Sequence, residues 1–157
     1  MRQRNSLRNK LGLQLAVLFF SLFFVALSAG AAEYVCINKD GVNIRSGPST
    51  KDEILWEVFK DFPLEVIQRQ GQWVQTVDFE GDKGWAFSPL LDNRKMVIVK
   101  VNAANMRIGA GTNYEIIATV KYGVVFKPLA EKEDWIQVQH QDGTTGWLYK
   151  KLVWPAD

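Results

Sequence analysis

The chain has 157 residues, with 19 Lys or Arg, 17 Asp or Glu, one His and one Cys. One Cys excludes an intramolecular disulfide, and one His with one Cys is too few for a zinc site. Four of the basic residues lie within the first ten positions, so the remainder has 15 basic and 17 acidic residues, a net charge of −2. A body of this charge has no general attraction to nucleic acid or anionic lipid, and no nucleic-acid partner is expected.

The N-terminus has the pattern of an export signal. Four basic residues precede an uncharged stretch, Leu11 to Ala32; they are Arg2, Arg4, Arg8 and Lys10. Ala29 and Ala31 have the spacing that signal peptidase prefers, so we predict a signal peptide over residues 1–31, cleaved after Ala31 or Ala32. The alternative is an uncleaved anchor, because 22 uncharged residues can span a bilayer. The body is then expected to be exported, periplasmic or extracellular, and to contact a membrane only through an uncleaved leader.

The rest of the chain contains one pattern twice, at an offset of 62 residues and without a gap. Residues 42–91 align on residues 104–153, and a period of about 60 residues suits a small domain used twice. We predict domains over residues 32–91 and 97–157 joined by a short charged linker, residues 92–96. The identities include Asn43/Asn105, Arg45/Arg107, Gly47/Gly109, Trp73/Trp135, Gly81/Gly143, Gly84/Gly146 and Trp85/Trp147.

Each copy is predicted to be a series of short β-strands, because β-branched or alternating segments are separated by Gly, Pro, Asn and Asp. The expected strands of the first copy are Tyr34–Ile37, Val42–Arg45, Ile54–Val58, Leu64–Arg69, Trp73–Val77 and Gly84–Phe87. Those of the second copy are Val97–Val101, Asn105–Ile108, Ile116–Val120, Val124–Leu129, Trp135–Val138 and Gly146–Tyr149. Strands this short bury their apolar faces best in a small barrel. The predicted fold is therefore all-β, two tandem small barrels after an N-terminal signal helix.

The order of motifs in each copy resembles that of a known family. An N-x-R-x-G run, a Trp-containing strand and a G-x-x-G-W element occur in that order twice, beginning at Asn43 and at Asn105. This pattern is similar to the bacterial SH3 domain (SH3b). The resemblance implies two SH3-like barrels, export, and a non-catalytic role in targeting or scaffolding at the cell envelope. Such domains often accompany wall hydrolases and amidases, and some bind peptidoglycan peptides.

The repeated residues are expected to be structural. Each arginine sits at a strand end and can donate hydrogen bonds to loop carbonyls, each glycine permits a bulge or a close crossing, and each tryptophan can pack on the barrel. These residues are Arg45, Gly47, Trp73, Gly84, Trp85, Arg107, Gly109, Trp135, Gly146 and Trp147.

Aromatic residues outside this shared set are the candidates for ligand binding. Several differ between the copies, and flat rings give contact area at little entropic cost. The predicted groove residues are Trp56, Phe79, Phe87, Tyr114 and Tyr149. Ordinary packing is the alternative role for each of them.

The inventory of reactive side chains argues against an enzyme. Cys36 and His140 would have to meet across two barrels, and Cys36 lies in a strand where a small buried apolar residue is expected. The acidic turn of Asp78, Glu80 and Asp82 is expected to be solvated and allows at most a weak calcium contact. No catalytic residue, metal site or cofactor is predicted.

These observations predict an exported, non-catalytic tandem module that recognises peptidoglycan or its stem peptides. The alternative is a periplasmic adaptor whose partner is an envelope protein.

Overall fold

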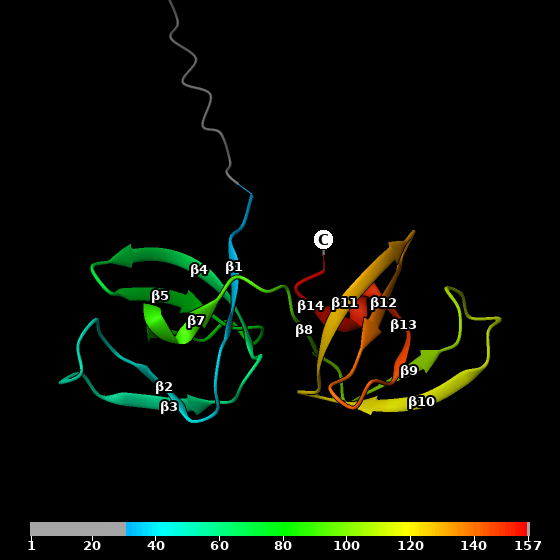
Figure 1. Ribbon diagram of the computed structural model, residues 1–157, viewed down its shortest axis with the longest axis horizontal. Coiled ribbons are helices and arrows are strands. Elements are labelled where there is room, and N and C mark those ends of the chain that lie inside the picture. Colours follow the sequence, from blue (N-terminus) through cyan, green and yellow to red (C-terminus); the bar gives the residue numbers. More distant parts are fainter. Residues whose placement is uncertain (1–30, 157) are drawn as a thin grey trace, which may run out of the picture. The chain divides into compact units, whose positions relative to one another are not determined.

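The computed structural model describes residues 31–156, which form one compact unit. Apart from Ala31, the predicted signal helix lies outside the described residues. Within them, no helix has the length and apolar character needed to cross a membrane. The fold is all-β, as predicted, with two copies of one strand arrangement (Figure 1).

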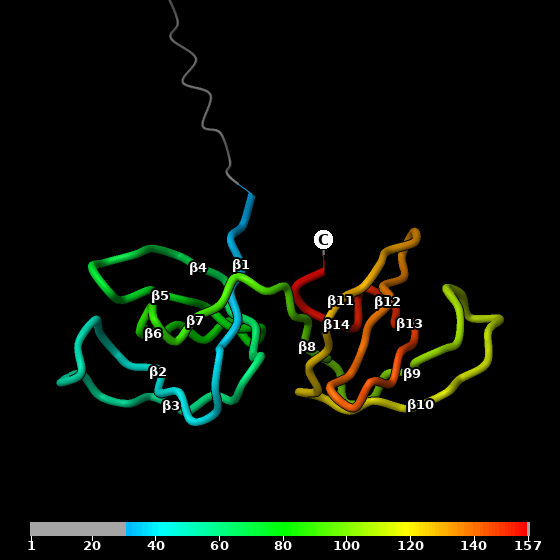
Figure 2. Tube along the Cα trace, in the orientation of Figure 1, coloured from blue at the N-terminus to red at the C-terminus, as the bar shows by residue number. Residues whose placement is uncertain are grey.

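Both copies contain the same elements in the same order, as the Cα trace also shows (Figure 2). The first copy has β1 Tyr34–Ile37, β2 Val42–Arg45, β3 Ile54–Val58, β4 Pro63–Gln70, β5 Trp73–Val77, β6 Lys83–Phe87, the 3-10 turn η1 Ser88–Leu90 and β7 Leu91–Asp92. The second has β8 Val97–Val99, β9 Ala103–Arg107, β10 Ile116–Lys121, β11 Val125–Lys132, β12 Trp135–Gln139, β13 Thr145–Tyr149, η2 Lys150–Leu152 and β14 Val153–Trp154.

Each copy forms one seven-stranded sheet. The hydrogen-bonded order is β3-β2-β6-β5-β4-β1-β7 in the first copy and β10-β9-β13-β12-β11-β8-β14 in the second. The register irregularities also repeat, between Val66 and Gln68 in β4 and between Pro128 and Ala130 in β11. Because a bulge bends its strand, the repeated bulge lets the long strand curve around the core in both copies.

The two short strands β7 and β14 were not expected from the sequence. Leu91 pairs with Ile37 and Asp92 with Cys36, so the stretch assigned to the connection begins as a strand on the edge of β1. Two residues carry too little periodicity to predict a strand, and this pairing depends on the tertiary position of β1.

Alternating side chains of the strands build the cores. In β2, Val42 and Ile44 are buried, whereas Asn43 and Arg45 are half-buried. The first core cluster consists of Val35, Ile37, Val42, Ile44, Val58, Phe62, Leu64, Ala86 and, from the second copy, Ile98. Ile98 is fully buried there, and Val125 and Trp154 of the second copy pack against the same cluster. The two copies therefore share apolar packing.

The turns use left-handed backbone at equivalent positions. Gly81 and Gly143 have φ values of 91° and 90° in the predicted hairpin turns. Before the long strand of each copy, Asp61 has φ 68° and its equivalent Gly123 has φ 79°. A residue with a β-carbon is uncommon in this conformation, and Asp is among those that tolerate it.

Candidate functional site

The two repeated arginines close the first loop of each copy. Arg45 Nη1 donates to the carbonyl oxygens of Thr50 and Asp52 at 3.1 and 2.8 Å. Arg107 Nη1 donates to the equivalent carbonyls of Thr112 and Tyr114 at 3.0 and 2.7 Å. One guanidinium nitrogen thus holds two carbonyls of its loop, and the side chain is committed to loop structure.

The loop glycines make room for the side chain at the end of that loop. A β-carbon on Gly109 would lie 2.5 Å from Cδ1 of Tyr114, and one on Gly47 would lie 2.6 Å from Oδ2 of Asp52. The Tyr114 ring therefore lies directly on the Gly109 backbone and remains 42% exposed. This exposure leaves Tyr114 accessible to a ligand.

Phe87 and Tyr149 occupy equivalent positions at the ends of β6 and β13. Phe87 packs on Trp73 with ring centroids 5.4 Å apart, and Tyr149 packs on Trp135 at 5.7 Å. In the second copy, this pair lines a pocket of about 820 Å³ together with Arg107 and the first loop. Each copy thus presents one half-buried aromatic pair.

Trp56 and Phe79 lie elsewhere in the first copy. Trp56 is half-buried on β3 and packs against the first core cluster. Phe79 lies in the β5–β6 turn, with ring centroids 6.0 Å from Phe62 and 5.3 Å from Tyr122 of the second copy. The five predicted groove residues therefore do not form one groove. Two of them, Phe87 and Tyr149, each pack on a tryptophan of their own copy, Trp73 and Trp135.

The other predicted structural residues lie beside these elements. Trp85 pairs with Arg45 across β2 and β6, and Trp147 pairs with Arg107 across β9 and β13. A β-carbon on Gly84 would lie 2.2 Å from Cγ2 of Ile44, and one on Gly146 would lie 2.5 Å from Cγ of Met106. Both glycines let their strand approach the core closely.

A second pocket, of about 720 Å³, was not predicted from the sequence. Residues of both copies and of the connection line it, including Asp40, Phe59, Lys60, Arg94, Lys127 and His140. We call it the junction pocket. The charged connection around Arg94 was the only part of this pocket that the sequence marked. The other lining residues come from segments far apart in the sequence, so only the tertiary structure brings them together.

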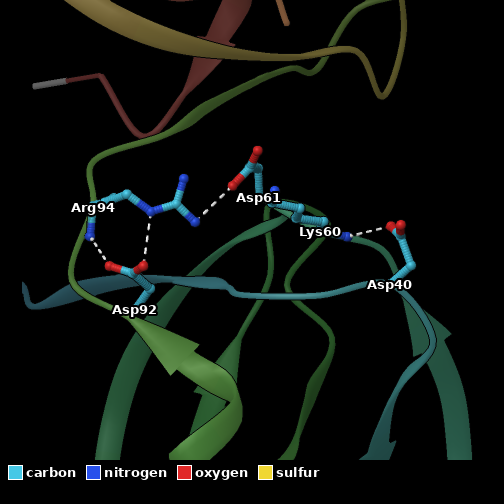
Figure 3. Close-up of polar contacts among 5 residues, drawn as sticks. All are labelled: Asp40, Lys60, Asp61, Asp92 and Arg94. Carbon is cyan, nitrogen blue, oxygen red and sulfur yellow. Dashed lines mark hydrogen bonds and ion pairs between the residues drawn. The ribbon is translucent and has the colours of Figure 1, made fainter.

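Arg94 bridges two carboxylates at the edge of this pocket (Figure 3). Its Nη2 lies 2.8 Å from Oδ1 of Asp61, and its Nε lies 2.8 Å from Oδ2 of Asp92. The side-chain hydrogen bond from Arg94 lowers the pKa of Asp92, and the same bond raises the pKa of Arg94. The bridge holds the connection against the turn that precedes β4.

Cys36 and His140 do not form a reactive pair. Cys36 is fully buried in β1, and this burial raises the pKa of its thiol to about 11. His140 Nδ1 lies 3.1 Å from Oδ2 of Asp142, a residue whose pKa is lowered to about 2, mainly by the Thr144 amide. A buried thiol with a raised pKa is a poor nucleophile.

The acidic turn brings three carboxylates together. Ligand atoms of Asp78, Glu80 and Asp82 lie within 4.8 Å of one another. Oδ1 of Asp78 accepts hydrogen bonds from the amides of Glu80 and Asp82 at 2.9 and 3.0 Å, and the Tyr122 hydroxyl bonds Glu80. These bonds explain the cluster as part of the turn and of its contact with the second copy.

A curated relative of this chain is named as an amidase. The "Putative N-acetylmuramoyl-L-alanine amidase YrvJ" of Bacillus subtilis (strain 168) is 28% identical over 141 residues, which are 83% of this chain and 27% of the relative. The chain thus spans about a quarter of that protein.

Solved structures with related arrangements contain longer chains. They include NlpC2 from Trichomonas vaginalis, with a TM-score of 0.33, 10% identity and coverage of 78% of this chain and 47% of that one. They also include an NlpC/P60 family protein from Bacillus cereus ATCC 10987, with a TM-score of 0.36, 15% identity and coverage of 76% and 55%. Likenesses this weak carry no argument about function.

The amidase relative corrects two predictions. The sequence was interpreted as a non-catalytic binding module and as no enzyme, and a relative named for an amidase contradicts both interpretations. The physical reason is that the repeated residues stabilise the fold through packing and loop closure. A fold alone does not determine function, so these residues do not distinguish a hydrolase from a binding protein.

The pattern of the bacterial SH3 domain matches the chain twice, over residues 38–93 and residues 100–155. Each match contains six of the seven strands of its sheet and the loop held by Arg45 or Arg107, and β1 and β8 lie just before the matches. By its sequence and its repeated fold, the chain belongs to the bacterial SH3 domain family.

Proposed function

We propose that this chain functions in the hydrolysis of cell-wall peptidoglycan, as the tandem SH3 part of an N-acetylmuramoyl-L-alanine amidase system. The observation that carries the proposal is the similarity to the B. subtilis amidase, which extends over 83% of this chain. On this proposal, the tandem domains hold the chain on the polymer, and hydrolysis benefits because the cleaved bonds are then at high local concentration.

The proposal includes export and the domain boundaries. Residues 1–31 are the leader that takes the chain to the envelope, and residues 32–91 and 97–157 are the two domains, joined by residues 92–96. The role requires export because the wall polymer lies outside the cytoplasm.

The aromatic residues are the proposed contacts with the wall, through its stem peptides. Phe87 on Trp73 and Tyr149 on Trp135 form half-buried pairs, and Tyr114 is exposed on its loop. Rings held by packing lose little conformational entropy when a peptide binds to them. Trp56 and Phe79 lie apart from these pairs, where Trp56 packs against the first core cluster and Phe79 contacts Tyr122.

The test joins the chain to an N-acetylmuramoyl-L-alanine amidase catalytic domain and measures the release of new amino groups from purified sacculi. We expect a rate at least about tenfold above that of the unjoined catalytic domain at low enzyme concentration, because tethering raises the effective concentration. The control carries an unrelated β-domain of the same size. Equal rates for the two fusions would overturn the proposal. Release of amino groups by the chain alone would support it and would locate catalytic groups within the chain.

A further inference from the structure

We propose that the junction pocket binds a carboxylate-bearing short peptide, with Lys60 of the first copy and Lys127 of the second supplying the positive charge. This inference rests on the proposed function for the source of the peptide, since a wall polymer carries peptides. Neither copy contains the site alone, because its lining residues come from both copies and from the connection.

The charges of the pocket favour an anion. Lys60, Arg94 and Lys127 line it together with the carboxylates Asp40 and Asp61. Arg94 is already bridged to Asp61 and to Asp92, which lies beside the pocket. Among residues 31–156, the ammonium groups of Lys60 and Lys127 have no hydrogen-bond or ion-pair partner. Asp40 accepts a hydrogen bond from the Lys60 amide and has no ion-pair partner within this range, so the unpaired charges are two cations and one carboxylate, an excess of one positive charge.

The uncharged lining favours a peptide over an inorganic anion. Gln139 and Gln141 offer amide donors and acceptors that match a peptide backbone, and Phe59, 45% exposed, offers apolar surface. The free cations are lysines, which act as point charges toward carboxylate and phosphate alike, so the preference for a peptide comes from the uncharged lining. The fork of Arg94 is directed to the two aspartates.

Contacts between the copies preform this pocket. Ile98 of the second copy is fully buried in the first core cluster, and the rings of Phe79 and Tyr122 pack in a tilted arrangement with centroids 5.3 Å apart. The Tyr122 hydroxyl also bonds Glu80. A ligand therefore meets lysines of both copies without having to bring two loose domains together, which reduces the cost of binding.

The test uses the dipeptide acetyl-alanyl-glutamate and its diamide, which has the same shape and no carboxylate. Binding to the purified protein is followed by NMR chemical-shift titration at low salt. We expect saturable shifts at Phe59, Gln139 and Gln141 with the acid, and at least about fivefold weaker binding of the diamide, because the lysine charges lose their partner.

Matched variants separate the pocket from general surface charge. Lys60→Gln with Lys127→Gln should weaken binding of the acid about tenfold and reduce its salt dependence. The control, Lys51→Gln with Lys132→Gln, removes the same charge from one exposed lysine of each copy outside the pocket and should leave the affinity unchanged. The amide spectrum of each variant establishes that it is folded.

Three results would overturn the inference. They are equal binding of acid and diamide, equal weakening by the two double variants, and displacement of the dipeptide by inorganic phosphate at equal concentration, which indicates a general anion site. The sacculus assay distinguishes the two proposals. If the dipeptide binds but the chain does not raise the amidase rate, the peptide site stands and the proposed function is wrong. If the chain raises the amidase rate but the dipeptide does not bind, only the peptide site is wrong.

Discussion

The loop arginines show how one side chain determines a local structure. Arg45 Nη1 donates to two carbonyls of the first loop, so Arg45→Ala leaves both carbonyls without this partner. We expect the free energy of unfolding to fall by about 2 kcal/mol, the usual scale for hydrogen bonds to a charged group. Urea denaturation measures the loss. Arg69→Ala, which removes an exposed ion pair with Glu33, should cost less than about 1 kcal/mol. Equal losses would contradict the proposed role of the loop bonds.

The raised pKa of Asp78 predicts that its carboxyl group stabilises the fold more in acid than at neutral pH. Burial raises the pKa of its carboxyl above the ordinary value of 3.8, against the hydrogen bonds from Asp82 and Glu80. An acid with a higher pKa in the folded state stabilises the fold below its unfolded pKa and loses this contribution as pH rises through the folded value. Asp78→Asn stays neutral and keeps an acceptor oxygen. Its unfolding free energy relative to the wild type should therefore be higher at neutral pH than below pH 3.8.

Asp142 provides the opposite control in the second copy. The Thr144 amide lowers its pKa to about 2, so its contribution is present above the unfolded pKa and is lost as pH falls through the folded value. Asp142→Asn should therefore lower the free energy of unfolding more at neutral pH than in acid. Denaturant titrations of both variants across this range give the comparison, and parallel pH profiles for Asp78→Asn and Asp142→Asn would contradict it.

At the scale of the elements, β6 and β13 each have a glycine at the equivalent position, but the two glycines face different side chains. A β-carbon on Gly84 would meet Cγ2 of Ile44 at 2.2 Å, whereas one on Gly146 would meet Cγ of Met106 at 2.5 Å. Ile is branched at Cβ and has little freedom at χ1, whereas Met is flexible. Gly84→Ala should destabilise by about 3 kcal/mol and Gly146→Ala by roughly 1 kcal/mol, measured from denaturation midpoints. A larger loss for Gly146→Ala would show that Met106 cannot rearrange.

The sequence predicted the strands that have their own periodicity. The bounds of β1, β2, β3 and β5 agree with the structure, because alternating or β-branched residues end at turn residues there. The long strands β4 and β11 extend beyond their predicted C-terminal ends, because the extending residues, Gln70 in β4 and Ala130, Glu131 and Lys132 in β11, are exposed and show no apolar alternation. Their pairing with β5 and β12, rather than their own composition, keeps them in the sheet.

At the scale of the whole molecule, the two copies should unfold together. Ile98 belongs to β8 of the second copy and is fully buried in the first core cluster. We expect NMR signals of both copies to disappear at one urea midpoint. Ile98→Ala should lower the stability by about 2–5 kcal/mol and shift the signals of both copies. Two separate midpoints in the wild-type protein would contradict this coupling.

The candidate sites could be predicted only in part. Tyr114 and the pairs at Phe87 and Tyr149 were identified as aromatic positions, but their partners depend on which strands lie next to each other. The junction pocket had no sequence signal beyond a charged connection, since Lys60 and Lys127 lie in separate copies. Electrostatic and packing sites made of distant residues have no period and no motif.

By itself, the sequence determined the duplication, the all-β class and the SH3-like family, because strand periodicity, turn glycines and the loop arginines are local features repeated at a fixed offset. The tertiary structure decided that Leu91–Asp92 and Val153–Trp154 are strands and that Ile98 belongs to the first core. It also decided that Arg94 bridges Asp61 and Asp92 beside a pocket shared by both copies. These contacts join residues whose proximity arises only when the chain is folded.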